Sequence, residues 1–214
     1  RRREEQKRKE EEKAAKAQAA AAKAAAGRCP EGMVEIAGGA FPMGSAGNDS
    51  ARDTWEKKLE PTDVKTFCID QYEFPGKKGE APRAGVTWEQ ARALCSGRGK
   101  RLCTEAEWEK ACKGAAGGRY PYGNQYDGGS CNTKGAGRQL SPSGSFAGCK
   151  SDYNVFDMSG NVKEWTSSDW SDVVQDKAVR GGSYSRPDWA TRCAFRENIR
   201  PDQSDSQIGF RCCQ

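Results

Sequence analysis

Arg180-Gly-Gly-Ser-Tyr184 begins the most informative pattern in the chain. A polar run containing Trp189 follows, then Arg192-Cys193-Ala194, and finally Ile208-Gly-Phe-Arg-Cys-Cys213. The paired glycines allow a close approach of the backbone or a bulge at the start of a strand. The run from Ile208 to Cys213 is short, apolar and β-compatible, which predicts a closing strand. The segment between them is polar, so we expect it to form a surface.

Four other motifs accompany this stretch, in order: Gly85-Val-Thr-Trp-Glu-Gln90, Gly99-Lys-Arg-Leu-Cys-Thr-Glu-Ala-Glu-Trp-Glu109, Tyr120-Pro-Tyr-Gly-Asn124 and Asp157-Met-Ser-Gly-Asn-Val-Lys-Glu-Trp-Thr166. Together they resemble the formylglycine-generating enzyme (sulfatase-modifying factor) family, from about Cys29 to Cys213. The resemblance implies an α+β, C-type-lectin-like fold. It also implies that catalytic members bind copper(I) through two cysteines just after the Gly-Gly-Ser-Tyr element, and oxidise a substrate cysteine to formylglycine.

The chain departs from that pattern at the copper site. Residues 185 to 192 contain no cysteine, and Arg186 stands where the resemblance places the first copper ligand. The loop is also shorter, so the position of the second ligand is missing. We therefore expect no copper in this protein.

Composition separates a charged segment from a globular body. Residues 1 to 26 contain nine Lys or Arg and five Glu, a net charge of +4, whereas the whole chain of 214 residues carries +5. The body is nearly neutral, which gives no argument for nucleic-acid binding. No run of 18 apolar residues exists, so we expect no membrane span in this segment. The chain begins at Arg1 without Met, which leaves open an upstream signal peptide, anchor or domain.

The sequence predicts two parts, a charged helical spacer over residues 1–27 and a disulfide-rich body over residues 28–214. Residues 1 to 26 are strong helix formers without an apolar stripe, and Gly27 ends the run. A solvated spacer explains this pattern. A membrane-surface or partner-binding arm is the alternative.

Two capping boxes predict helices in the body. Thr87 with Gln90 opens a helix that Gly97 stops, and Thr104 with Glu107 opens one that Gly114 stops. The inward sides should carry Trp88, Ala91, Leu94 and Cys95 in the first and Trp108, Ala111 and Cys112 in the second. Met33–Ile36 and residues 64 to 72 predict strands, with Phe67 and Ile69 on one face. Residues 114 to 150 have no period and predict a long, compact loop region.

Ten cysteines without a repeated Cys-x-x-Cys pair favour a disulfide framework over zinc ligation or reduced, buried thiols. Cys131 and Cys149 bracket half of the long loop and are natural partners. The family resemblance implies the pairs Cys95–Cys212 and Cys112–Cys193, with a free, nucleophilic Cys193 as the alternative. It leaves Cys29, Cys68, Cys103 and Cys213 unassigned. Such a framework indicates an extracytoplasmic location, whether periplasmic, cell-surface or secreted.

Histidine is absent from the chain. This excludes Ser-His and Cys-His catalysis and His-ligated zinc or iron. It also argues against the iron-dependent sulfoxide synthases that share the superfamily.

The resemblance implies a calcium site at Asp157, Gly160, Val162 and Glu164, formed by two side chains and two backbone carbonyls. Calcium takes several hard oxygen ligands, and a Gly-Asn turn between two acids turns carbonyls inward. An Asp-initiated turn with a solvated Glu164 is the alternative. At the family's other calcium site only Asn132 and Thr133 match.

Aromatic and polar side chains near the former copper position predict a surface for a peptide, protein or glycan ligand. Its predicted residues are Ser183, Tyr184, Ser185, Arg186, Asp188, Trp189 and Arg192. We expect Trp189, which follows Pro187 in a polar run, to be the exposed anchor, and Trp165 to lie in the core. Trp170 belongs to the same sequence cluster.

The sequence thus predicts a non-catalytic ligand-binding or sensor module on this scaffold. The enzyme alternative is a copper-dependent oxidase that converts peptidyl cysteine to formylglycine. A third possibility is a hypervariable lectin-like receptor, diversified at its C-terminal segment, although one sequence does not reveal variability.

Overall fold

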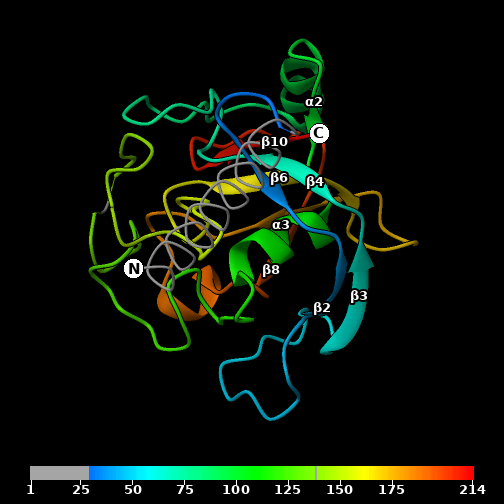
Figure 1. Ribbon diagram of the computed structural model, residues 1–214, viewed down its shortest axis with the longest axis vertical. Coiled ribbons are helices and arrows are strands. Elements are labelled where there is room, and N and C mark those ends of the chain that lie inside the picture. Colours follow the sequence, from blue (N-terminus) through cyan, green and yellow to red (C-terminus); the bar gives the residue numbers. More distant parts are fainter. Residues whose placement is uncertain (1–28, 138) are drawn as a thin grey trace, which may run out of the picture. The chain divides into compact units, whose positions relative to one another are not determined.

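The fold is a mixture of short strands and two helices, seen in a computed structural model that describes residues 29–137 and 139–214 (Figure 1). The predicted spacer over residues 1–27 lies outside the described residues. The chain divides after Glu31, and the unit described below is Gly32–Gln214. Its strands are β1 Met33–Ile36, β2 Gly39–Met43, β3 Glu60–Val64, β4 Phe67–Asp70, β5 Arg101–Leu102, β6 Lys163–Asp169, β7 Lys177–Arg180, β8 Arg196–Ile199, β9 Ile208–Phe210 and β10 Cys212–Cys213. Its helices are α2 Trp88–Ser96, α3 Glu105–Lys113 and the 3₁₀ turn η1 Asp188–Thr191.

The described strands of this unit form three sheets. The strand orders are β1-β4-β10-β5, β2-β3 and β8-β7-β6-β9. Pairing is antiparallel except between β6 and β9, which are parallel. The last two strands of the chain therefore join different sheets, and they tie the two four-stranded sheets together.

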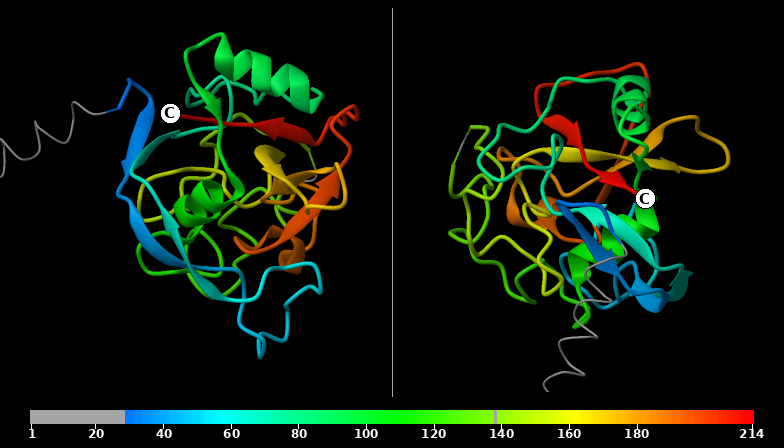
Figure 2. Two further views of the ribbon diagram at one scale, coloured as in Figure 1. Left: turned by 90° about the vertical axis from the view of Figure 1, so that its right-hand side faces the viewer. Right: turned by 45° about the horizontal axis from the view of Figure 1, so that its top comes forward.

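Both predicted helices are confirmed, with both capping boxes formed. Thr87 caps α2 together with Gln90, and Thr104 caps α3 together with Glu107. Trp108, Ala111 and Cys112 of α3 pack in one core cluster, whereas Ala91 and Cys95 of α2 pack in a second. In Figure 2 the two helices lie on opposite sides of the red C-terminal strands.

The predicted closing strand over residues 208 to 213 is two strands rather than one. Arg211 separates β9 from β10, and its side chain is fully buried against Glu164. The predicted strand over residues 64 to 72 is likewise divided, because Val64 ends β3 and β4 begins at Phe67. In both cases pairing partners from distant segments decide where each strand ends.

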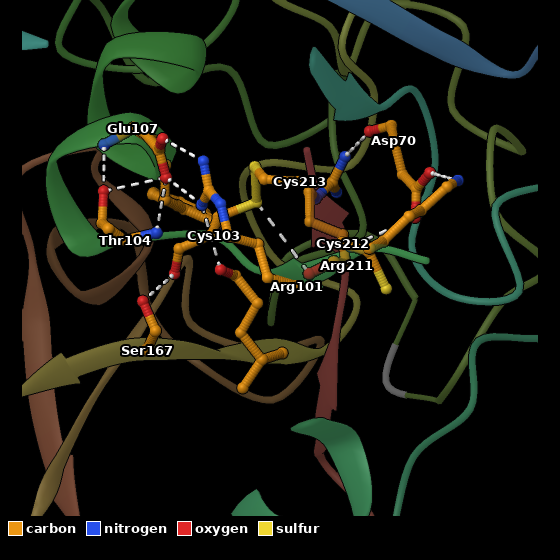
Figure 3. Close-up of a disulfide and its surroundings, with 12 residues drawn as sticks. Asp70, Arg101, Cys103, Thr104, Glu107, Ser167, Arg211, Cys212 and Cys213 are labelled. Atoms are coloured by element: carbon orange, nitrogen blue, oxygen red, sulfur yellow. Dashed lines mark hydrogen bonds and ion pairs between the residues drawn. A yellow bond between two sulfur atoms is a disulfide. The ribbon is translucent and has the colours of Figure 1, made fainter. Parts of the chain in front are cut away.

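The disulfides join these layers. Cys95–Cys212, Cys112–Cys193 and Cys131–Cys149 are confirmed, and Cys103 pairs with Cys213 (Figure 3). Neighbouring residues of a strand point to opposite faces, so Cys212 reaches the α2 side while Cys213 reaches the α3 side. Cys29 and Cys68 are disulfide-bonded as well, which gives five disulfides. The alternatives of reduced thiols and a nucleophilic Cys193 are therefore wrong.

The long loop region is confirmed: between α3 and β6 the described residues form no helix or strand. Figure 3 shows how its neighbour α3 is fixed at its start. Glu107 accepts two hydrogen bonds from Arg101 of β5, at 2.6 and 2.7 Å, and one from the Thr104 amide at 2.8 Å. The helix that carries Cys112 is thus anchored to the sheet at its N-terminal end.

Candidate functional site

The predicted ligand surface begins where β7 ends. Gly181 and Gly182 follow this strand rather than start a new one, and both have positive φ, at 87° and 64°. A Cβ at Gly182 would lie 2.3 Å from the Ala190 carbonyl oxygen, so only glycine fits there. The close approach folds the loop back onto η1 and leaves residues 184 to 189 at the surface.

The seven predicted ligand residues divide into two groups. Ser185, Asp188 and Trp189 are exposed, with Trp189 at 42%, and Tyr184 and Arg186 are half-buried. Ser183 is fully buried and donates a hydrogen bond to Gln207 Oε1 at 2.6 Å. Arg192 is also buried, so these two side chains support the surface from below and do not form part of it.

Arg192 fastens residues 49 to 56 to the C-terminal loop. Its guanidinium contacts Asp49 at 3.3 Å, the Ala51 carbonyl and the Glu56 carboxylate. Its Nε donates to the Trp189 carbonyl at 3.0 Å. The backbone of the predicted anchor is therefore held by a buried arginine.

Arg186, at the expected position of the first copper ligand, forms an ion pair with Glu197 of β8. Its carbonyl oxygen accepts a hydrogen bond from the Lys134 amide at 3.1 Å. The side chain is therefore tied to the neighbouring strand, and its backbone borders the long loop.

Three tyrosines beside this surface were missed as site residues, although two of them belong to the Tyr120–Asn124 motif. Tyr120 stacks on Tyr122 at 5.4 Å, and Tyr126 lies 5.7 Å from Tyr120. The Tyr120 hydroxyl donates to the Asp188 carbonyl at 3.4 Å. Burial raises the pKa of Tyr120 and of Tyr122 to about 12, so both hydroxyls stay protonated at neutral pH. The high density of tyrosine in a polar loop was the available signal.

The other two tryptophans of the sequence cluster have different places. Trp165 is buried in the core, as predicted. Trp170 is half-buried, with the Arg196 guanidinium 4.0 Å from its ring and Trp55 at 6.1 Å. Of the predicted aromatic set, only Tyr184 and Trp189 therefore belong to the loop surface.

Three of the predicted calcium residues lie in the turn that leads into β6, and the fourth, Glu164, lies at the start of this strand. Gly160 and Asn161 adopt left-handed conformations, with φ of 81° and 54°. Asp157 Oδ2 accepts a hydrogen bond from the Gly144 amide at 2.6 Å, and burial raises the pKa of this carboxyl to about 6. The Gly144 amide and the positive charge of Arg211 lower this pKa, but the effect of burial is larger.

Glu164 is fully buried, so the alternative of a solvated Glu164 is wrong. It accepts hydrogen bonds from Trp108 Nε1 at 2.8 Å and from two nitrogens of Arg211 at 2.7 Å. Glu73, which the sequence did not single out, is a third carboxyl that interacts with the charges of Asp157 and Glu164. Burial, and then the charges of Asp157 and Glu164, raise the pKa of Glu73 well above its usual value.

This donor set fits calcium in part. Asp157 offers a buried carboxylate without sufficient positive charge, whereas Glu164 already shares its carboxylate with Arg211. Within residues 29–137 and 139–214, no three Asp, Glu, His or Cys side chains are placed together as a metal site. A bound ion would therefore depend on backbone carbonyls for several of its ligands.

Comparison with known families decides what this scaffold is. Residues 75–214 match the sulfatase-modifying factor enzyme 1-like domain. The chain belongs to this family. Among the helices of residues 29–137 and 139–214, none has the length and apolar composition of a membrane span.

Curated relatives of this sulfatase-modifying factor domain include proteins named as an enzyme, as an inactive enzyme and as a protein kinase. The chain is 36% identical to inactive C-alpha-formylglycine-generating enzyme 2 of Bos taurus, covering 64% of this chain and 51% of that protein. It is 33% identical to formylglycine-generating enzyme of Mus musculus, with coverage of 61% and 43%. The serine/threonine-protein kinase pkn1 of Chlamydia caviae is 36% identical, with coverage of 62% and 24%. The chain thus spans about half or less of the length of these relatives.

Solved structures confirm the fold of the sulfatase-modifying factor domain. PvdO from Pseudomonas aeruginosa has a TM-score of 0.74 at 24% identity, and the match covers 85% of this chain and 93% of that one. Variable protein 1 of Treponema denticola has a TM-score of 0.71 at 18% identity, covering 85% and 94%. The expected α+β, C-type-lectin-like architecture is therefore correct.

Proposed function

We propose that the protein is a non-catalytic, extracytoplasmic ligand-binding module on a sulfatase-modifying factor scaffold. One observation carries the proposal: all ten cysteines are disulfide-bonded, so no thiolate is available. The resemblance places two cysteine thiolates on the copper, and copper(I) prefers such soft sulfur ligands. Arg186, paired with Glu197, adds a positive charge where the resemblance places the first of them.

The ligand surface is the exposed loop over residues 184 to 189 together with the tyrosine loop beside it. Trp189 packs edge-on against Phe195 at 5.6 Å and still exposes 42% of its surface. Tyr126 adds a second exposed ring, at 37%. Rigid aromatic rings with hydroxyl and carboxylate neighbours suit stacking and hydrogen bonding to a peptide, protein or glycan.

The relatives and the disulfides support this reading. One curated relative is named as an inactive formylglycine-generating enzyme, and in the kinase the matched region is 24% of the chain. Domains of this family therefore occur in inactive proteins and as parts of larger ones. Five disulfides are typical of proteins from an oxidising compartment, which supports an extracytoplasmic location.

A copper(I)-supplemented oxidation assay on a cysteine-containing sulfatase peptide tests the non-catalytic assignment. We expect the peptide thiol to persist and no aldehyde to form. Copper-dependent loss of the thiol with gain of an aldehyde would establish the enzyme alternative, a formylglycine-generating oxidase.

Ligand binding is tested on peptide and glycan arrays with the wild-type protein and two tryptophan variants. Trp189→Ala should weaken binding of the best array ligand by roughly 1 to 3 kcal/mol, the range of a strong interface truncation. Trp55→Ala is the matched control, because Trp55 is 66% exposed but outside the loop surface. Equal affinities for wild type and Trp189→Ala would show that the surface is wrongly placed.

We further propose that a structural calcium ion binds at Asp157, Gly160, Val162 and Glu164. The buried, incompletely compensated Asp157 supports this assignment, since a divalent cation would offset its charge. The carbonyls of Gly160 and Val162 would supply the further hard oxygens. Glu164 Oε1, which accepts one hydrogen bond from Arg211, would also contact the ion.

A further inference from the structure

A groove of about 760 Å³ lies apart from the loop surface and from the calcium residues. Its lining includes Trp88 at the start of α2, Asp172 and Val174 of the loop between β6 and β7, and Asp202. In Figure 2 this ochre loop projects beside α2 in the right-hand view.

The indole ring of Trp88, which lines this groove, lies close to two cationic side chains. Trp88 Nε1 donates to the Thr166 carbonyl at 2.8 Å, which fixes the ring in one orientation. The Lys177 ammonium lies 4.3 Å from the ring centroid and is paired with Asp169. The Arg92 guanidinium lies 5.8 Å from the same ring. An aromatic face with a carboxylate beside it attracts cations, and here the chain supplies two of its own.

The remaining charge at the groove is negative and accessible. Its lining carries the carboxylates of Glu89, Asp169, Asp172 and Asp202, with Lys177 as the lining cation. Glu89 pairs with Arg92 and Asp202 with Arg200, each at 2.8 Å, and all four side chains are more than half exposed. Such exposed pairs exchange partners at little cost. Within the described residues Asp172 has no ion pair.

An apolar lip runs along the same loop. Val173 is 91% exposed and Val174 is 42% exposed. Ser171 Oγ accepts hydrogen bonds from both of their amides, at 3.4 and 3.1 Å, which shapes the loop that carries them. Lysine and arginine place long methylene stems on apolar surface while their charged ends reach acids. A cationic ligand with such stems matches the lip and the carboxylates together.

We propose that this groove binds a segment of a partner protein rich in lysine and arginine. The charge of the lining, the indole that already holds ammonium and guanidinium groups, and the valine lip all favour such a segment over an acidic peptide or an uncharged sugar. The surface is separate from the loop over residues 184 to 189, so the protein can hold two ligands of different chemistry.

The test uses the full chain and a fluorescein-labelled peptide of four lysines separated by glycines, with the matching glutamate peptide for comparison. Fluorescence anisotropy should show binding of the lysine peptide, weakened by added salt, and no comparable binding of the glutamate peptide. Asp172→Asn should weaken binding about two- to fivefold, the range of one exposed ion pair. Asp63→Asn, the same charge change on an exposed residue of β3, should leave it unchanged.

Lys177→Met provides a change in the opposite direction. It frees Asp169 and one face of Trp88, so the lysine peptide should bind about two- to fivefold more tightly. Lys65→Met, the same change at an exposed lysine that does not line the groove, is its control. Equal effects of Asp172→Asn and Asp63→Asn, no gain of Lys177→Met over Lys65→Met, or equally tight binding of the glutamate peptide would each overturn the proposal.

Discussion

Replacing Arg192 with methionine tests whether a buried ion pair holds the binding loop in place. The Arg192 and Glu56 side chains are 1% and 0% exposed. Without the guanidinium, the paired Glu56 oxygen keeps only the Asp53 amide, at 3.2 Å, whereas Asp49 keeps its ion pair with Arg119. Removing one partner of a buried pair costs about 3 to 5 kcal/mol, because the other charge stays buried. We expect Arg192→Met to lower the free energy of unfolding by about that amount.

Urea unfolding of the oxidised protein measures this loss, with Arg186→Met as the matched control. The Arg186–Glu197 pair is partly exposed, at 33% and 22%, and Lys163 lies 3.8 Å from Glu197. Its removal should cost no more than about 1 kcal/mol. Adding Glu56→Gln to Arg192→Met should recover at least half of the loss, since the buried charge then disappears.

Two results would refute this reasoning. If Arg192→Met and Arg186→Met destabilise equally, burial of the pair has no energetic consequence. If Glu56→Gln fails to recover stability in the Arg192→Met background, the loss comes from packing around Arg192 and not from an uncompensated carboxylate.

Three further predictions concern the metal, pH and the disulfides. Calcium should raise the free energy of unfolding by RT ln(1 + [L]/Kd), about 2.7 kcal/mol at a hundredfold excess over Kd, and therefore raise the melting temperature. An unchanged melting temperature on adding calcium to verified metal-free protein would contradict the site. In chelated protein, burial raises the pKa of the Asp157 carboxyl to about 6, so the folded state binds the carboxyl proton more tightly than the unfolded state does. Protonation of Asp157 therefore contributes fully to stability below the unfolded pKa near 4, and this contribution is lost as pH rises through about 6. Asp157→Asn should remove that dependence in urea titrations at pH 5 and pH 7.5, and an unchanged profile would assign it to Glu73. Reduction should unfold the body, and peptide mapping that finds Cys95 or Cys193 alkylated without reduction would contradict the disulfide assignment.

The sequence by itself determined the features that depend on local chemistry. Thr87 with Gln90 and Thr104 with Glu107 lie three residues apart, so each capping box forms within one turn whatever surrounds it. Cys131–Cys149 closes a short loop, with a sequence separation of 18, and its pairing followed from position along the chain. The lack of histidine in the sequence is enough to exclude Ser-His and Cys-His catalysis.

The family motifs made two further predictions possible, because the resemblance implies two long-range disulfides that no local pattern in the sequence indicates. Cys95–Cys212 and Cys112–Cys193 span 117 and 81 residues. The pairing of Cys103 with Cys213 required the structure, since alternation along β10 assigns adjacent cysteines to opposite faces only once its neighbours are known.

Only the tertiary structure decided which polar side chains are accessible. Arg192 and Trp189 lie three residues apart in one polar run, yet the first is buried by residues 49 to 56 and the second stays exposed. Glu73 lies near Asp157, and Asp172 and Trp88 line the same groove, because segments far apart in the chain pack together. Burial and charge pairing depend on which distant segments pack together, and that information is spread over the whole chain and is absent from any local stretch.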